Sequence, residues 1–390
     1  MSITAPLGFR AAGVAAGLKA SGRPDVALVV NDGPDHVAAA VFTSNRVVAA
    51  PVVWSRTVVG DGVAHAVVLN SGGANACTGP DGFGDTHRTA EHVADVLGVS
   101  AGDVLVCSTG LIGERLDLPA LFAGVDDAAG RLAADGGPDA ARAIMTTDTV
   151  PKEVLVEGAD GAWRVGGMAK GAGMLAPALA TMLCVLTTDA VVDAEDARAA
   201  LADATAATFD RIDSDGCMST NDTVALLASG ASGVRADRAA LTAALTRACG
   251  ALARALIADA EGASHDIAVT VRGATSVPAA LAVARAVTRS NLLKAAVFGN
   301  DPNWGRVLAA VGTVPADVAP FDADALDVAI NGVQVCRAGG VGEDRAGVDL
   351  AASREVRIDI DLHAGAAEDV TVWSNDLTHD YVHENSAYST

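Results

Sequence analysis

The stretch KGAGMLAPALATMLCVLTTDA, residues 170–190, changes character at Thr181. Small residues and Pro177 precede that position, a composition typical of a pliable loop. The residues that follow are apolar and rich in β-formers, which predicts a buried strand over 181–188. The threonine at this junction has two interpretations. Either it is an ordinary strand residue, or the chain is cut before it and Thr181 becomes a new N-terminus.

Strand and helix patterns occur on both sides of this stretch. Strand-like runs cover residues 25–30, 65–70, 103–108, 223–229, 266–271 and 355–363. Helical periodicity places Leu201, Thr205 and Phe209 on one face over 193–209, and Leu241, Leu245, Leu252 and Leu256 on one face over 237–260. The glycine-rich stretches 71–84 and 158–161 are typical of loops. This mixture predicts an α/β or mixed α+β fold.

Length and composition set the broad class. A chain of 390 residues suits two domains or one large α/β unit. No apolar run approaches the roughly 20 residues of a membrane span. The N-terminus makes a poor signal peptide because Arg10 and Lys19 interrupt it. We therefore expect a soluble, cytoplasmic protein with no membrane partner.

Charge and cysteine spacing narrow the choice of partners. The net charge of −21 argues against nucleic acid, because phosphate binding needs a basic surface. The six cysteines are far apart and form no CxxC pair. That spacing favours reduced, buried thiols over a zinc site or a disulfide scaffold.

The common cofactor and hydrolase motifs are missing. The sequence holds no GxxxxGK[ST], no GxGxxG that follows a strand, and no GxSxG. In DRIDSDG, residues 210–216, Arg211 occupies the first ligand position of a calcium loop. His379 and His383 are four residues apart but have no further ligand cluster. We expect neither a metal nor a cofactor.

A threonine can act without a histidine if it carries its own base. An N-terminal amine has a pKa of about 7.7–8.0, so much of it is neutral near physiological pH. Held beside its own hydroxyl, it can take the proton as that hydroxyl attacks a carbonyl. Only cleavage of the Ala180–Thr181 bond creates such an amine on Thr181.

Several motifs together resemble the ornithine acetyltransferase (glutamate N-acetyltransferase) family of arginine biosynthesis. They span almost the whole chain: GFRAAGVAAGLK (8–19), FTSNR (42–46), STGLIGERL (108–116), MTTDTVPKE (145–153), GGMAKGAGM (166–174), ATMLCVLTTDA (180–190), GNDPNWGR (299–306) and HENSAYST (383–390). One detail departs from the family, since many relatives have a more polar residue than Ala176. The proline, alanine and threonine of the cleavage motif are all present.

The resemblance implies an autoprocessed enzyme in which helices sandwich β-sheets, as in the ornithine acetyltransferase/DmpA-like architecture. Residues 1–180 would form an α fragment and residues 181–390 a β fragment that begins with the nucleophile. Two such pairs would associate as an α2β2 heterotetramer. The Thr109 hydroxyl and the Gly110 N–H would form the oxyanion hole; on the segment alone, an ordinary strand-ending turn is the alternative. The substrate contacts would be Thr147, Lys170, Thr181, Glu261, Asn385 and Thr390.

The expected reaction moves the acetyl group of N2-acetyl-L-ornithine to L-glutamate through an acetyl-Thr181 ester. Some family members also take the acetyl group from acetyl-CoA. The alternatives are an N-terminal-nucleophile amidase or aminopeptidase, a paralogous acyltransferase of secondary metabolism, and a silent ligand-binding protein with an intact chain. Lys170 suits an α-carboxylate and Glu261 an ammonium group, although each is otherwise an ordinary loop or helix-end charge.

Overall fold

The chain divides into two compact units. Among the described residues, unit 1 comprises those up to 210 together with 217–259, and unit 2 comprises 211–216 together with 260–387. The computed structural model describes residues 2–158, 161–176 and 182–387. Both units combine helices with mixed sheets, which confirms the predicted α/β class.

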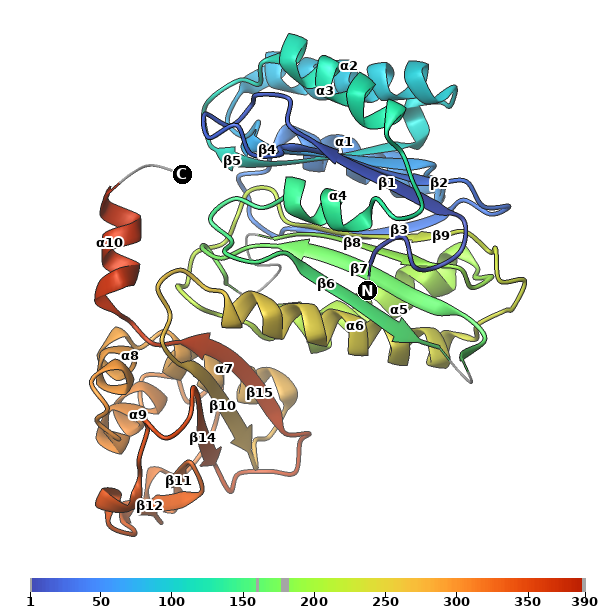
Figure 1. The fold of residues 1–390 in the computed structure, drawn as a ribbon. Helices are drawn as coiled ribbons and strands as arrows, with labels where there is room; N and C mark the ends of the chain where they lie inside the picture. Colours follow the sequence, from blue (N-terminus) through green and yellow to red (C-terminus); the bar gives the residue numbers. More distant parts are fainter. Residues whose placement is uncertain (1, 159–160, 177–181, 388–390) are drawn as a thin grey trace. The chain divides into compact units, whose positions relative to one another are not determined.

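The first sheet of unit 1 has the order β1-β2-β4-β5. Its strands are β1 (Phe9–Val14), β2 (Val26–Asn31), β4 (Ala66–Gly73) and β5 (Val104–Leu111). Neighbours are antiparallel except β4 and β5, which run parallel. Helices α2 (Gly79–Leu97) and α3 (Leu118–Gly130) cover one face, where Val93 and Val125 pack against Val68 and Val106 (Figure 1).

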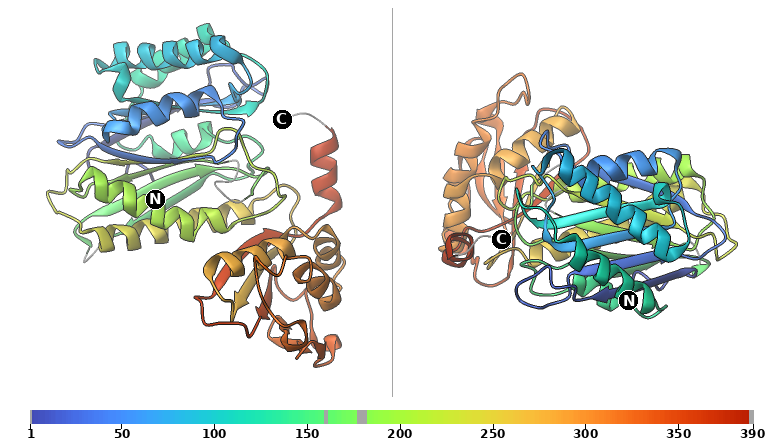
Figure 2. Two further views of the ribbon diagram at one scale, coloured as in Figure 1. Left: turned by 180° about the vertical axis from the view of Figure 1, so that it is seen from behind. Right: turned by 90° about the horizontal axis from the view of Figure 1, so that it is seen from above.

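The second sheet of unit 1 has the order β3-β9-β8-β7-β6. Its strands are β3 (Val37–Phe42), β9 (Thr223–Ala228), β8 (Leu183–Thr188), β7 (Arg164–Lys170) and β6 (Lys152–Glu157). Strands β8 and β9 run parallel, and the other neighbours are antiparallel. Helices α5 (Ala194–Ala207) and α6 (Arg238–Ala258) cover its outer face (Figure 2).

The two sheets of unit 1 pack against each other across a shared apolar core. Leu69 and Leu105 from the first sheet meet Val185 and Leu227 from the second. Helix α1 (Ala50–Val58) packs along β5, and α4 (Gly137–Ala143) packs along β1. Helices α2 and α3 on one side and α5 and α6 on the other therefore flank the pair of sheets, as the sequence resemblance implies, while α4 contacts strands of both sheets.

The predicted fragments interleave within the second sheet. Strands β3, β7 and β6 precede residue 180, whereas β8 and β9 follow it. The sheet order inserts β8 and β9 between β3 and β7, with six residue pairs in register on each side. A chain cut between residues 180 and 181 would keep both ladders, because all of their paired residues lie outside 180–181.

Helix α6 is long and apolar enough to cross a membrane by length and composition alone. Its predicted stripe of Leu241, Leu245, Leu252 and Leu256 is buried, and the helix packs on β6, β7 and α5. The Asp237 side chain caps its first turn by accepting the Ala240 N–H. The helix is thus a core element of unit 1.

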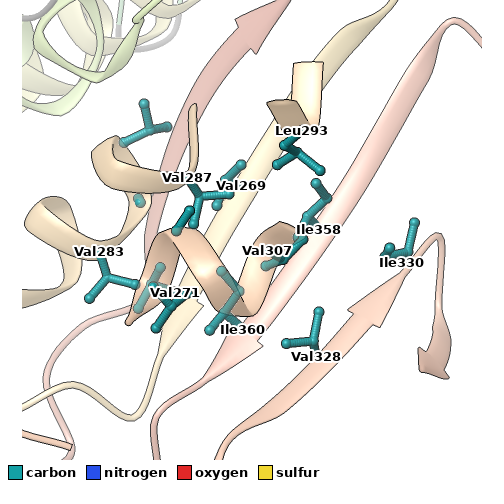
Figure 3. Packing of buried hydrophobic residues seen from close by; sticks show 14 of the residues in the cluster. Val269, Val271, Val283, Val287, Leu293, Val307, Val328, Ile330, Ile358 and Ile360 are labelled. Atoms are coloured by element: carbon teal, nitrogen blue, oxygen red, sulfur yellow. The ribbon is translucent and has the colours of Figure 1, made fainter. Parts of the chain in front are cut away.

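Unit 2 is built on a six-stranded sheet with the order β13-β12-β11-β14-β10-β15. The strands are β10 (Asp266–Arg272), β11 (Asp327–Ile330), β12 (Val333–Arg337), β13 (Gly340–Val341), β14 (Glu355–Asp361) and β15 (Val370–Asn375). The helices are α7 (Val277–Thr288), α8 (Asn291–Phe298), α9 (Trp304–Val311) and α10 (His379–Ala387). Figure 3 shows Val283, Leu293 and Val307 of the first three helices among apolar side chains of the sheet.

Most elements predicted from the sequence are present. The alternating pattern at 355–363 forms β14, where Val356, Ile358 and Ile360 are buried. The helix expected over 193–209 ends at Ala207, and Phe209 lies in the short 3-10 turn that follows, still buried.

Two expectations were wrong. The loop expected over 71–84 is shorter, because residues 71–73 complete β4 and α2 begins at Gly79 with Pro80 in its first turn. The thiols are not all buried, since Cys77 and Cys217 are exposed.

Candidate active site

The predicted oxyanion residues lie at the end of β5. Ser71 and Gly72 of β4 pair with Thr109 and Gly110, and the register shifts at Gly73. Gly110 has a φ of +129°, and a Cβ there would stand 2.6 Å from the Gly73 nitrogen. Only glycine fits this conformation and this close approach. The Thr-Gly step is therefore a tightly fixed strand end and not a loose turn.

Lys170 ends β7 and lies beside Thr109. Its side chain is 2% exposed, and its Nζ donates a hydrogen bond to Thr109 Oγ1 at 3.1 Å. The interpretation of Lys170 as a solvated loop charge is wrong. Because the hydroxyl oxygen accepts from the lysine, its own proton is available to a different acceptor. The packing of the two sheets thus brings together two predicted site residues that are distant in sequence.

Asp148 connects this lysine to the MTTDT segment, residues 145–149. The carboxylate accepts the Gly171 N–H at 2.7 Å and the Thr146 N–H at 2.9 Å. It also pairs with the buried Lys152 at 2.6 Å. Burial would raise the pKa of Asp148, but the Lys170 and Lys152 charges and the Gly171 N–H lower it below the ordinary value. An ionised aspartate therefore anchors both sides of the half-buried Thr147.

A third lysine supports the same segment. Lys19 Nζ donates to the Met145 carbonyl at 2.6 Å and to the Pro24 carbonyl at 2.9 Å. Burial lowers the pKa of Lys19 to about 8, and Lys170 contributes to that shift while Asp25 opposes it. Lys19 therefore holds the backbone at Met145, two residues before Thr147.

The start of β8 is held by residues that precede β9. Because the two strands run parallel with Leu183 opposite Thr223, Met182 lies beside Asp222. The Met182 N–H donates to Asp222 Oδ1 at 2.9 Å. Asn221 Nδ2 donates to the carbonyls of Ser108 and Ala74, which ties this loop to the oxyanion segment. Ala180 and Thr181, the predicted cleavage pair, lie outside the described residues.

Two further predicted contacts, Glu261 and Asn385, belong to unit 2. Asn385 on α10 donates from Nδ2 to Glu261 Oε2 at 2.9 Å, so these two residues form a pair. Gly262, with a φ of +61°, allows this approach, since a Cβ there would stand 2.3 Å from the Tyr381 nitrogen. Thr390 lies outside the described residues.

Sequence reasoning missed several residues of this site. Asp148, Lys152 and Lys19 lie within segments that carry the family resemblance, but no local pattern singles them out. Asn221 and Asp222 carry no such signal. Within residues 2–158, 161–176 and 182–387, no group of three or more His, Cys, Asp or Glu side chains is arranged to hold a metal ion.

Comparison with known proteins gives consistent relatives. The ArgJ family model matches residues 10–390. A protein of Thermobifida fusca named arginine biosynthesis bifunctional protein ArgJ is 61% identical over 100% of both chains. A protein of the same name from Bifidobacterium longum is 58% identical, again over 100% of both. In the crystal structure of the ornithine acetyltransferase of Mycobacterium tuberculosis complexed with ornithine, one chain is 57% identical, with a TM-score of 0.45 over 47% of this chain and 96% of that one.

Proposed function

The chain belongs to the ArgJ family, and from this premise we propose that it transfers the acetyl group of N2-acetyl-L-ornithine to L-glutamate in arginine biosynthesis. Identity of 61% over the full length of a protein named for arginine biosynthesis is the observation that carries the proposal. The hydrogen bond between Lys170 and Thr109 adds chemical support, because it prepares a hydroxyl as a donor where an oxyanion would form.

The active form arises by cleavage between Ala180 and Thr181. The Thr181 hydroxyl attacks the Ala180 carbonyl, the peptide C–N bond breaks, and water hydrolyses the resulting ester. The products are a carboxylate on Ala180 and a free amine on Thr181. The ladders that join β8 and β9 to β7 and β3 support a stable complex of the two fragments, 1–180 and 181–390.

The first half-reaction acylates the threonine. The Thr181 amine takes the hydroxyl proton while Oγ forms a bond to the acetyl carbon, and the carbonyl electron pair moves onto oxygen. The Thr109 hydroxyl and the Gly110 N–H stabilise that oxyanion. Lys170 donates to Thr109 Oγ1, which leaves the hydroxyl proton for the oxyanion. Collapse breaks the C–N bond, and ornithine leaves with the proton from the ammonium.

The second half-reaction transfers the acetyl group from Thr181 to L-glutamate by the same type of steps. The glutamate amine attacks the ester carbon, Thr181 Oγ leaves and regains its proton, and N-acetylglutamate is released. Thr147, Lys170, Glu261, Asn385 and Thr390 bind the substrates. The Glu261 carboxylate suits the ammonium end of ornithine. Since one site serves both substrates in turn, the kinetics are ping-pong.

A second donor is part of the proposal. The relatives are named bifunctional, and acetyl-CoA can acylate the same threonine by the same steps. The enzyme would then also make N-acetylglutamate from acetyl-CoA. We further propose an α2β2 assembly, a cytoplasmic location, and no metal or other cofactor.

Trapping the acyl-enzyme tests this function. Incubation with N2-acetyl-L-ornithine without glutamate should add one acetyl group to the fragment 181–390, located on Thr181 by peptide mass spectrometry. Addition of glutamate should remove that group and yield N-acetylglutamate. An amidase would instead release acetate at a rate that glutamate does not change, and a binding protein would acquire no acetyl group.

A further inference from the structure

Asp222 occupies a position that the reaction as described does not use. It precedes β9, is 0% exposed, and its backbone carbonyl accepts the Thr43 N–H at 2.9 Å. Its Oδ1 accepts the Met182 N–H at 2.9 Å, while Thr223 N–H donates back to the Met182 carbonyl at 3.3 Å. Both backbone polar groups of the residue that follows the predicted nucleophile are therefore fixed.

The other oxygen of this carboxyl group lacks a partner. Asp222 Oδ2 is buried and accepts no hydrogen bond from the part of the chain that the structure describes. The Thr43 hydroxyl lies nearby but donates to the Ser219 carbonyl at 2.7 Å. The Ser219 hydroxyl oxygen accepts the Asn221 N–H. A buried acceptor without a donor destabilises the fold, so its retention calls for a donor that arrives later.

Covalent geometry limits which donor can arrive. The Thr181 nitrogen is three bonds from the Met182 nitrogen, hence within about 4 Å of it. Before cleavage this nitrogen belongs to an amide, and after cleavage it is an amine with additional N–H donors. An acceptor next to the one that holds Met182 can therefore reach the amine that scission creates.

We propose that Asp222 is the positioning residue for the Thr181 amine, with Oδ1 on the Met182 N–H and Oδ2 accepting one hydrogen of the new N-terminus. This contact leaves the nitrogen lone pair to face the Thr181 hydroxyl, so that the amine acts as its base. The inference rests on the proposed function, because it requires cleavage before Thr181.

The local charges agree with this assignment. Burial raises the pKa of the Asp222 carboxyl well above its ordinary value, and the Met182 N–H, the Lys170 ammonium and the nearby Ser219 and Thr43 hydroxyls oppose that rise. A donor with positive character at Oδ2 would act in the same direction as these groups. The Thr181 amine, which alternates between neutral and protonated forms during turnover, is such a donor.

The test compares the full-length wild type with Asp222→Asn and with Asp189→Asn. Asparagine keeps an acceptor for Met182 but replaces the second acceptor with an NH2 group. Asp189 is a matched control, since it is a buried aspartate at the other end of β8 whose oxygens accept the N–H groups of Leu7 and Arg164. For each protein, intact mass gives the extent of cleavage, and steady-state kinetics give kcat and KM for N2-acetyl-L-ornithine.

The proposal predicts that Asp222→Asn is cleaved and keeps its KM while kcat falls about 10²-fold, the lower end of general-base contributions. Asp189→Asn should keep the kcat of the wild type. Wild-type kcat in cleaved Asp222→Asn would overturn the proposal. So would a folded but uncleaved Asp222→Asn chain, because Asp222 would then act before the amine exists.

A second variant and the wild type complete the test. If Asp222→Asn does not fold, Asp222→Glu carries the test, because it keeps two acceptor oxygens but displaces them by one methylene. Cleavage with a lowered kcat and an unchanged KM supports the proposal, and a wild-type kcat overturns it. A wild-type chain without cleavage or acetyl-Thr181 would instead show that the proposed function itself is wrong.

Discussion

A buried aspartate lies at each end of strand β8, and the two differ in how many of their carboxylate oxygens accept hydrogen bonds. At the C-terminal end, Asp189 accepts the Leu7 N–H at 3.0 Å on one oxygen and the Arg164 N–H at 2.7 Å on the other. At the N-terminal end, Asp222 holds the Met182 N–H on one oxygen, and the other accepts no hydrogen bond from the described residues.

This difference separates a structural end of the sheet from a functional one. Both carboxylate oxygens of Asp189 accept hydrogen bonds within the fold, and they connect the segments that contain Leu7 and Arg164 to the end of β8. Asp222 is incomplete, and it shares its end of the sheet with Lys170, which reaches the oxyanion segment at Thr109. Incomplete hydrogen bonding of a buried group, more than burial or charge alone, distinguishes the end where chemistry is expected.

The largest effect should come from Thr181→Ala. Without the hydroxyl there is neither self-cleavage nor an acyl acceptor, so activity should fall by about 10⁶-fold, as for loss of a nucleophile elsewhere. A denaturing gel should show one full-length band. Thr181→Ser, which retains a hydroxyl, is the matched control and should still be cleaved. A processed or active Thr181→Ala protein would remove the distinction between the two ends of β8.

Thr109→Ala should have the next largest effect. Loss of one oxyanion donor typically lowers kcat by 10²–10³, or about 2.7–4 kcal/mol. The reduction should appear in kcat for acetyl transfer, whereas Thr109→Ser should retain most of the rate. Equal rates for the alanine and serine variants would show that the hydroxyl is not a donor in the reaction.

Lys170→Met should lower kcat about 10-fold, because it acts through the Thr109 hydroxyl. The measurement is a double-mutant cycle with Thr109→Ala. Once the hydroxyl is gone, removal of the lysine should cost little more, so the two effects should fall short of additivity. Full additivity would mean that the contribution of Lys170 to kcat is independent of the Thr109 hydroxyl.

Asp189→Asn should have the smallest effect on catalysis and a measurable effect on stability. It loses one of two accepted hydrogen bonds and buries an amide in its place, at a cost of about 1–3 kcal/mol. Urea unfolding of the variant and the wild type measures that loss. A fall in kcat without a loss of stability would reverse the roles assigned to the two ends.

Sequence patterns were informative where one face of an element is buried and the other is wet. The alternation in β14 and the leucine stripe of α6 predicted both elements, because apolar spacing directly reports such a face. Strand β7 was not predicted. Its Gly166 and Gly167 lower strand propensity, yet the Pro6 ring and the Leu186 side chain lie too close for any Cβ at these positions.

Sequence patterns were also insufficient to predict all the contacts of the candidate site. The family resemblance pointed to Thr109, Lys170 and Thr147, and the structure joins the first two by a hydrogen bond. The contact of Asp148 with Gly171 and that of Asp222 with Met182 join segments that are 23 and 40 residues apart in the chain, so no local pattern could reveal them. The pair formed by Glu261 and Asn385 also spans the chain and became visible only in the folded structure.

The most direct test is intact mass combined with N-terminal sequencing of the purified, active wild-type protein. We predict two fragments, 1–180 and 181–390, the second beginning Thr-Met-Leu-Cys. A fully active enzyme that consists of a single uncut chain would contradict it, since Thr181 would then have no amine to serve as its base.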